Sequence, residues 1–259
     1  MTRHTVNASI LLTDRPLLER PAAARAAGFD AVEFWWPWPQ TATPSADQVD
    51  AFVAAIEDAG VQLTGLNFFA GDMPAGERGI VNNPARQDEF RANVDLVVEI
   101  GERLGCKHFN ALYGLHADGI DEEAEAEAAR ANLSYAAKAV DAIGGTVLLE
   151  PVSGAEAYPL KKAADALAVI DSVGAGNIRL LADFYHLAVN GDDVAAVIAE
   201  HAQDFGHIQI ADAPGRGAPG TGDLPLDTWI KAAQDGGYDG PIGLEYIAGE
   251  GDPFAWVQA

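Results

Sequence analysis

Side chains that can bind a metal ion lie at or near the C-terminal ends of four apolar runs in the second half of this chain. The runs are 146–150, 178–183, 206–211 and 241–246, and the side chains are Glu150, Asp183, Gln209 and Glu245. A carboxylate at the end of an apolar run is costly to bury unless it is paired or bound to a cation. If the four converge, three carboxylates and an amide need a shared counter-ion, and a divalent metal is the simplest one.

The ligand types indicate which metal such a site would hold. All four are oxygen donors, and no cysteine or definite histidine ligand accompanies them. Oxygen ligands favour Mg²⁺ or Mn²⁺ over Zn²⁺ or Cu²⁺. The single cysteine, Cys106, excludes a disulfide within the chain and a cysteine-rich zinc site. Its apolar surroundings predict a small buried core residue.

The four runs belong to an alternation of strand and helix patterns along all 259 residues. Strands are expected at 5–11, 30–36, 61–68, 106–112, 146–150, 178–183, 206–211 and 241–246. Helices are expected between them, at 21–27, 45–59, 86–104, 121–143, 160–173, 192–203 and 226–235. This pattern predicts an α/β fold, a single (β/α)8 TIM barrel with residues 1–259 as one domain. The alternative is a doubly wound open sheet, but the first strand–helix turn lacks the Gly-x-Gly-x-x-Gly expected there.

A barrel would bring the four metal-competent side chains together. Active sites of such barrels lie at the C-terminal ends of the strands. Alternate residues of a strand face the interior, so Glu150 shares a face with Leu148, and Gln209 with His207. We expect His207, one pleat below Gln209, to be a buried, hydrogen-bonded residue. The four oxygens can therefore point toward one spot.

The charge balance of the chain indicates which class of partner to expect. The chain has 39 acidic and 16 basic residues, for a net charge of −23. A nucleic-acid backbone or an anionic membrane surface would repel it, so we expect a small-molecule partner. The N-terminus does not resemble a signal peptide, and no apolar run approaches the ~18 residues of a membrane span, so we expect a cytoplasmic protein. The tryptophan-rich segment 34–38 is where the interface of a homo-oligomer would be sought.

Short motifs along nearly the whole chain resemble those of the hydroxypyruvate isomerase family. They are AGDMPAGERG at 70–79, EFRANVD at 89–95, LEP at 149–151, ADFYH at 182–186, HIQIAD at 207–212, PGR at 214–216, PGTG at 219–222 and GLEY at 243–246. This family is part of the wider group of xylose-isomerase-like barrels, which also includes sugar isomerases, epimerases and an endonuclease branch.

The resemblance implies a reaction and roles for the candidate residues. It implies a divalent metal held by Glu150, Asp183, Gln209 and Glu245, with Glu150 and Glu245 also acting as acid–base groups. The implied reaction is of the aldose–ketose type. It interconverts hydroxypyruvate and tartronate semialdehyde, or a closely related small hydroxy-carbonyl acid, by proton transfer through an enediolate.

Three positions depart from the family pattern. Ala188 stands where the family typically has Gln, Ala218 where it has Glu, and Ser153 where it has Asn. None of the three is an expected metal ligand. They would instead reshape the substrate pocket.

Four further residues are expected to contact substrate. His186 follows Asp183 by three positions, on a loop at the same barrel face, where an imidazole could polarise a substrate oxygen. Arg216 lies among glycines and prolines, where a guanidinium suits bidentate capture of a carboxylate. Glu77 and Arg78 belong to a Gly- and Pro-rich loop at 69–83, long enough to form a lid.

Other functions fit parts of the same pattern. The nearest alternative is a sugar or sugar-acid isomerase or epimerase of the same superfamily. A metal-dependent phosphodiesterase would need many histidine ligands and a basic groove, against six histidines and a net charge of −23. A barrel that binds a ligand without turnover is a third class, and the pair Glu150 and Glu245 argues against it.

Overall fold

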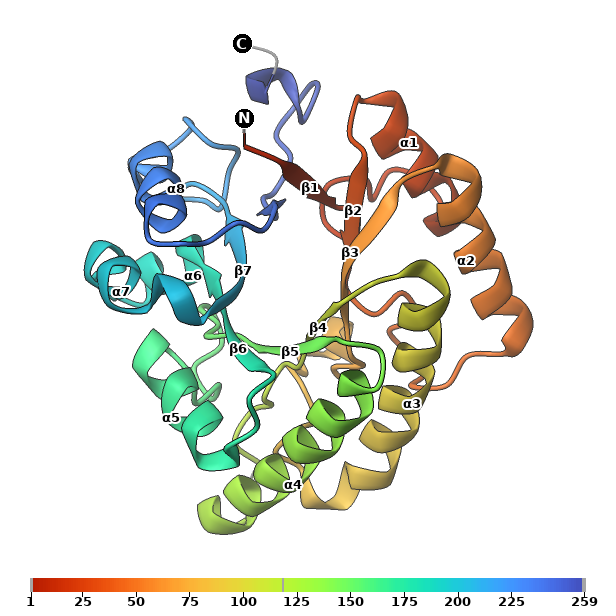
Figure 1. Ribbon diagram of the computed structural model, residues 1–259, viewed down its shortest axis with the longest axis vertical. Helices are drawn as coiled ribbons and strands as arrows, with labels where there is room; N and C mark the ends of the chain where they lie inside the picture. The colour runs from red at the N-terminus through yellow and green to blue at the C-terminus, as the bar shows by residue number, and fades with distance from the viewer. Residues whose placement is uncertain (1, 118, 258–259) are drawn as a thin grey trace.

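Eight parallel strands close into a barrel, in chain order, in the computed structural model, which describes residues 2–117 and 119–257 (Figure 1). The strands are β1 (His4–Asn7), β2 (Ala31–Phe34), β3 (Gln62–Asn67), β4 (His108–Asn110), β5 (Thr146–Leu149), β6 (Ile178–Asp183), β7 (Phe205–Ile210) and β8 (Ile242–Leu244). β1 pairs with both β2 and β8, which closes the sheet. The prediction of a single (β/α)8 TIM barrel is confirmed.

The helices form a ring outside the strands (Figure 1). They are α1 (Arg20–Ala26), α2 (Ala46–Ala59), α3 (Gln87–Leu104), α4 (Glu122–Asp141), α5 (Ala163–Val173), α6 (Phe184–Val189), α7 (Val194–His201) and α8 (Leu226–Asp235). Short 3-10 turns are η1 (Leu17–Glu19), η2 (Met73–Ala75), η3 (Pro84–Arg86), η4 (Ala202–Asp204) and η5 (Ala255–Val257). The sequence pattern did not predict α6. It carries His186, which therefore lies on a helix and not on a loop.

The ends of α2 show how local sequence sets the helix boundaries. The Ser45 hydroxyl accepts from the backbone N–H of Gln48, and the Gln48 side chain accepts from the backbone N–H of Ser45. This reciprocal pair satisfies two N–H groups that the first turn leaves free. The helix ends at Gly60, whose φ of 63° lies in the left-handed region that glycine adopts without steric cost.

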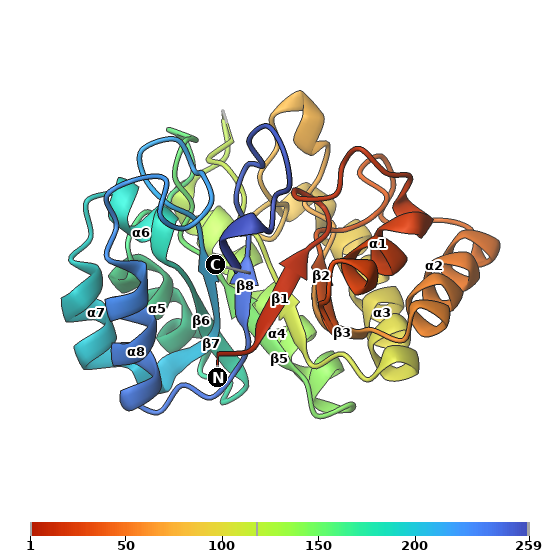
Figure 2. The same ribbon diagram turned by 90° about the horizontal axis from the view of Figure 1, so that it is seen from above.

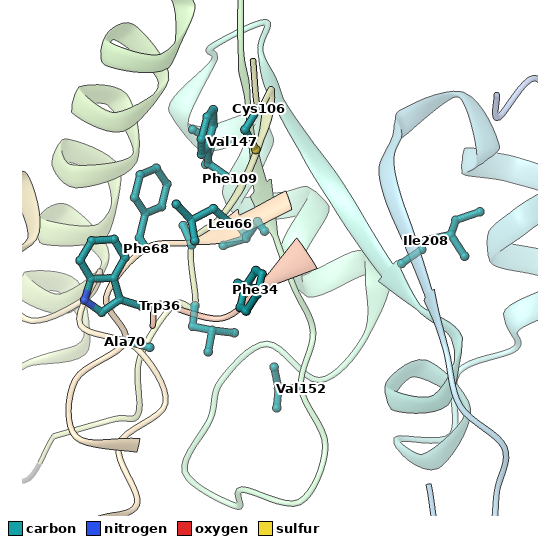
Figure 3. Close-up of a cluster of buried hydrophobic side chains, with 14 of the residues drawn as sticks. Phe34, Trp36, Leu66, Phe68, Ala70, Cys106, Phe109, Val147, Val152 and Ile208 are labelled. Atoms are coloured by element: carbon teal, nitrogen blue, oxygen red, sulfur yellow. The ribbon is translucent and has the colours of Figure 1, made fainter. Parts of the chain in front are cut away.

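A continuous apolar core fills the space between the barrel and its helices. Figure 3 shows part of it, including Phe34, Leu66, Phe68 and Phe109. The Phe68 ring packs 6.1 Å from Phe109 and 5.6 Å from Phe90 of α3, measured between centroids. Burying one such ring stabilises the fold by roughly 1.5–3 kcal/mol. Cys106 lies in this core as expected, and burial raises the pKa of its thiol to about 12.

The loops that follow the strands rise above one end of the barrel (Figure 2). They include residues 68–83, which contain η2. The polar strand-end residues lie at this end of the barrel. None of the helices within residues 2–117 and 119–257 is long and apolar enough to cross a membrane.

Candidate active site

The four strand-end side chains converge at the C-terminal end of the barrel. Asp183 is the last residue of β6, Gln209 lies in β7, and Glu150 and Glu245 directly follow β5 and β8. Asp183 pairs in register with Gln209, and Gln209 with Gly243 two residues before Glu245. All four side chains are at least 95% buried. We call these four residues the carboxylate cluster.

Two fully buried oxygens of the carboxylate cluster have no hydrogen-bond partner within residues 2–117 and 119–257. They are Oδ2 of Asp183 and Oε1 of Gln209, both buried. The other oxygen of Asp183 accepts from the backbone N–H groups of Tyr185 and His186, so it caps α6. A buried acceptor without a partner is costly, and a bound cation would satisfy both atoms. The donor set of this cluster therefore fits a divalent metal.

A second set of possible metal ligands shares two residues with the carboxylate cluster. Glu150, Asp183 and His186 each offer a ligand atom, and these atoms lie within 4.8 Å of one another. The two carboxylates of this trio are thus close enough to share a metal ion at this end of the barrel. Three carboxylates and an amide are the hard oxygen donors that Mg²⁺ and Mn²⁺ prefer.

Burial strongly raises the pKa values of the two glutamates. It raises the pKa of Glu150 well above the usual range, and the carboxylates of Glu245 and Asp183 raise it further. Burial also raises the pKa of Glu245 to about 8, although the Arg216 guanidinium opposes the shift. A cation beside these carboxylates would lower both pKa values and favour the charged forms.

His186 is held in one tautomer. The backbone N–H of Ser153 donates to its Nδ1 at 3.0 Å, and the Ser153 hydroxyl lies 2.7 Å from the same atom. Burial lowers the pKa of His186 to about 4, so the ring is neutral at neutral pH and carries its proton on Nε2. That atom lies 3.6 Å from Asp183 Oδ2 and 3.9 Å from Glu150 Oε1. In this tautomer His186 donates a hydrogen bond toward the site and is not free to ligate a metal.

Arg216 reaches the carboxylate cluster from the loop after β7. Backbone hydrogen bonds between Asp212 and Gly217 close this loop, and Arg216 has a φ of 56°, uncommon for a residue with a side chain. Its Nη2 lies 2.5 Å from Glu245 Oε1 and 3.6 Å from Asp183 Oδ2. The Arg216 guanidinium therefore pairs with two carboxylates of the cluster, those of Glu245 and Asp183.

Glu77 and Arg78 have different surroundings, although they are neighbours in the loop after β3. The Glu77 carboxylate pairs with Arg86 at 2.7 Å and accepts from the backbone N–H of Asp72. Arg78 lines the cleft above the carboxylate cluster. Its Nη1 donates to the carbonyls of Met73 and Glu77. The structure thus brings Arg78 to the cleft and leaves Glu77 supporting the loop behind it.

Three polar residues that the motif analysis did not assign hold the carboxylate cluster in place. Asn110 donates to Glu150 Oε2 at 2.7 Å, and Asn7 donates to Glu245 Oε2 at 2.7 Å. Glu33 of β2 accepts from His207 and from Gln209 Nε2, each at 2.7 Å. Asn7 and Asn110 end β1 and β4, so the strand-end rule used for the other strands could have found them.

The Glu33 contact sets the orientation of the Gln209 amide. Gln209 Nε2 donates both to Glu33 Oε1 at 2.7 Å and to Glu245 Oε2 at 2.6 Å. Because both N–H groups are engaged, the amide oxygen is the atom left for the site. His207 is buried and bonded to Glu33, as the sequence predicted.

A cleft of about 700 Å³ opens above the carboxylate cluster. On the β5–β8 side it is lined by Glu150, Ser153, His186, Arg216 and Glu245, and on the β1–β3 side by Leu17, Arg20, Trp35, Trp36, Met73 and Arg78. Ala188 and Ala218 are not among its described lining residues. The third departure from the family pattern, Ser153, lines the cleft and bonds His186.

Comparison with known proteins places this fold and cleft in a family. The profile of the xylose isomerase-like TIM barrel family matches residues 21–259. A Streptomyces coelicolor protein named "Putative hydroxypyruvate isomerase" is 50% identical, over 99% of this chain and 96% of its own length. A 2-oxo-tetronate isomerase from Cupriavidus necator is 34% identical, over 100% of this chain and 98% of its own. A solved Brucella melitensis structure titled "AP endonuclease, family 2" superposes with a TM-score of 0.89 at 30% identity, covering 100% of this chain and 98% of that one.

The chain therefore belongs to the xylose isomerase-like TIM barrel family. Its resemblance to the hydroxypyruvate isomerases is confirmed by these relatives. Within the family, it is an isomerase of the hydroxypyruvate isomerase group, and hence an enzyme.

Proposed function

We propose that this protein interconverts hydroxypyruvate and tartronate semialdehyde, or a closely related small hydroxy-carbonyl acid, with Mg²⁺ or Mn²⁺ as its cofactor. The observation that carries the proposal is the pairing of two kinds of group in one cluster. Glu150 and Glu245 offer carboxylates, and Asp183 and Gln209 offer buried oxygens without a partner. Metal ligands and acid–base groups at one place suit an isomerisation by proton transfer.

The chemistry divides between the cation and the side chains. A divalent cation held by Glu150, Asp183, Gln209 and Glu245 would polarise the carbonyl and hydroxyl oxygens of the substrate and lower the pKa of the C–H beside them. One glutamate takes that proton, which leaves an enediolate. The other glutamate returns a proton to the neighbouring carbon, and the hydroxyl proton passes to the former carbonyl oxygen.

The remaining cleft residues orient the substrate. His186 presents its Nε2–H toward the carboxylate cluster and would donate to a substrate oxygen. Arg216 would contact the substrate oxygens that lie beside Glu245. Arg78 lines the cleft from the loop after β3, and Glu77 holds that loop through Arg86.

A second candidate is isomerisation of a four-carbon 2-oxo acid. It is favoured by the 2-oxo-tetronate isomerase at 34% identity and by a cleft of about 700 Å³, which leaves room beyond a three-carbon acid. Phosphodiester hydrolysis is disfavoured, because a net charge of −23 would repel a nucleic-acid backbone.

The test is a substrate screen on the metal-loaded enzyme. Hydroxypyruvate and 2-oxo-tetronate are each incubated with enzyme and Mg²⁺ or Mn²⁺, and the product is identified by NMR. We expect isomerisation of at least one acid, loss of activity after chelation, and recovery when metal is added back. Full activity in protein shown by elemental analysis to be metal-free, or no turnover of any hydroxy-carbonyl acid, would overturn the proposal.

A further inference from the structure

Two further arginines line the active-site cleft on its β1–β3 side. Arg20 is the first residue of α1, and Arg78 lies in the loop after β3. The segments that follow β1, β2 and β3 stand on one side of the barrel mouth, and those that follow β6 and β7 stand on the other (Figure 2). We call Arg20 and Arg78 the rim arginines.

Both rim arginines are anchored by neutral groups. Arg20 donates to the carbonyls of Ala8 and Arg15, at 3.1 and 3.0 Å. Arg78 Nη1 donates to the carbonyls of Met73 and Glu77, at 3.0 and 2.7 Å. Among residues 2–117 and 119–257, no carboxylate forms an ion pair with either of them. A guanidinium has five N–H donors, so each keeps donors for a ligand.

The absence of an acidic partner is informative in a chain this acidic. With 39 acidic and 16 basic residues, cations without acidic partners are not expected to gather in one cleft by composition alone. Arg216, the third arginine of the cleft, does pair with acids, at Glu245 and Asp183. The rim arginines are therefore the cleft cations that remain available to an anion.

The charge of the carboxylate cluster leads to the same conclusion. Glu150, Asp183 and Glu245 are three negative charges when ionised. One divalent cation and the Arg216 guanidinium together balance them. A substrate carboxylate thus finds no surplus positive charge at the cluster, and a second cation is needed elsewhere in the cleft.

We propose that the rim arginines form the subsite for the substrate carboxylate, so that a hydroxy-carbonyl acid spans the cleft with its reacting carbons at the cluster and its carboxylate at Arg20 and Arg78. This assignment rests on the proposed function and sharpens it. It makes the substrate class an anionic acid, because a neutral sugar of the same length would leave the two guanidinium groups without an anionic partner. It also separates the rim arginines from Arg216, which serves the cluster.

The test measures binding without turnover. D-glycerate has the carboxylate and hydroxyls of a three-carbon acid but no ketone or aldehyde group, so it cannot isomerise. Glycerol is its neutral counterpart. Calorimetry with Mg²⁺-loaded protein compares wild type, the double variant Arg20→Gln/Arg78→Gln, and a control double variant, Arg103→Gln/Arg130→Gln. The control changes net charge equally, at Arg103 of α3, which pairs with Asp50 of α2, and at Arg130 of α4, which pairs with Glu123 of the same helix.

We expect the rim double variant to bind glycerate at least tenfold more weakly, with the control unchanged and glycerol binding unaffected. Arg78→Gln alone should also weaken glycerate binding, and it covers the case in which the double variant does not fold. Wild-type glycerate affinity in a folded rim variant would overturn the inference, as would an equal loss for glycerol.

The isomerisation assay separates this inference from the proposed function. Turnover of hydroxypyruvate with glycerate affinity independent of the rim arginines would overturn the subsite alone. Glycerate binding that depends on the rim arginines, in a protein that isomerises no acid, would leave the subsite standing and overturn the reaction.

Discussion

The two glutamates of the carboxylate cluster have unequal surroundings. Glu245 has both oxygens engaged, one by Arg216 and the other by Asn7 and Gln209. Glu150 has one oxygen bonded to Asn110, while the other accepts no hydrogen bond from the residues that the structure describes and lies 3.9 Å from His186 Nε2. A base needs an oxygen that is free to accept a proton, so Glu150 is the better candidate to abstract it from hydroxypyruvate.

The prediction at this scale is that Glu150→Gln and Glu245→Gln separate the two proton transfers. Glutamine keeps the shape of the glutamate side chain and one oxygen that can ligate a metal, but it cannot act as a base. The value of kcat should therefore fall about 10²–10⁴-fold. Glu150→Gln should neither form product nor exchange substrate hydrogen with D₂O, whereas Glu245→Gln should still exchange it. NMR in D₂O measures exchange, elemental analysis measures metal, and the exposed Glu123→Gln is the control. Near-normal turnover in both metal-loaded variants would leave these glutamates as ligands only.

At the scale of elements, the register of β2, β7 and β8 positions the amide of Gln209. Gly243 of β8 leaves the space in which Glu33 and Gln209 meet. A Cβ at Gly243 would lie 2.7 Å from Gln209 Cγ and 2.9 Å from Glu33 Oε1. The glycine is thus needed for the close approach of side chains from β2 and β7, in a packed barrel interior that tolerates little added volume.

We therefore expect Gly243→Ala to weaken metal binding although it replaces none of the four proposed ligands. The added methyl group displaces Gln209 and breaks its contact with Glu33, and such overpacking typically costs about 1–3 kcal/mol of stability. Titration with Mn²⁺ followed by electron paramagnetic resonance gives the metal affinity, and thermal denaturation gives the stability. Gly176→Ala is the matched control, because its Cβ would meet no atom within 4 Å. An unchanged Mn²⁺ affinity in Gly243→Ala would contradict this reading of the barrel interior.

At the scale of the whole molecule, metal binding, protonation and folding are linked. The folded state raises the pKa of Glu245 from 4.5 to about 8, mainly through burial, and burial raises that of Glu150 in the same direction. Between the unfolded and folded pKa values, the metal-free folded protein therefore binds more protons than the unfolded chain. Its stability should fall as pH rises through that window. A bound cation replaces those protons and removes the loss.

The melting temperature of metal-free protein should accordingly drop between pH 5 and pH 8, and 10 mM Mg²⁺ should raise it more at pH 8 than at pH 5. The Glu245→Gln variant lacks one of the two carboxylates whose pKa is raised. The melting temperature of the metal-free variant should therefore depend less steeply on pH than that of the wild type. Differential scanning calorimetry on both proteins, with and without Mg²⁺, gives the comparison. Identical pH profiles for wild type and Glu245→Gln would show that this carboxylate does not titrate in that window.

The sequence by itself determined the barrel and its four strand-end candidates. Eight apolar runs separated by helical patterns specify local periodicity, and parallel pairing then carries the ends of neighbouring strands to one face. Glu150, Asp183, Gln209 and Glu245 could be named because each lies at or beside the C-terminal end of its own strand. The helix α6 escaped prediction because its six residues are too few for a periodic pattern, and its N-terminus depends on the Asp183 side chain.

Only the tertiary structure decided which groups pair. Glu33 and Gln209 are 176 residues apart and meet because the barrel closes. Ser153 lies in the loop after β5 and His186 in α6 after β6, and their contact sets the tautomer. Arg216 and Arg78 look alike in sequence, each in a loop rich in glycine and proline, yet one pairs with the carboxylate cluster and the other does not. Sequence periodicity specifies which face a residue takes, whereas partners across a barrel depend on strand register and loop path.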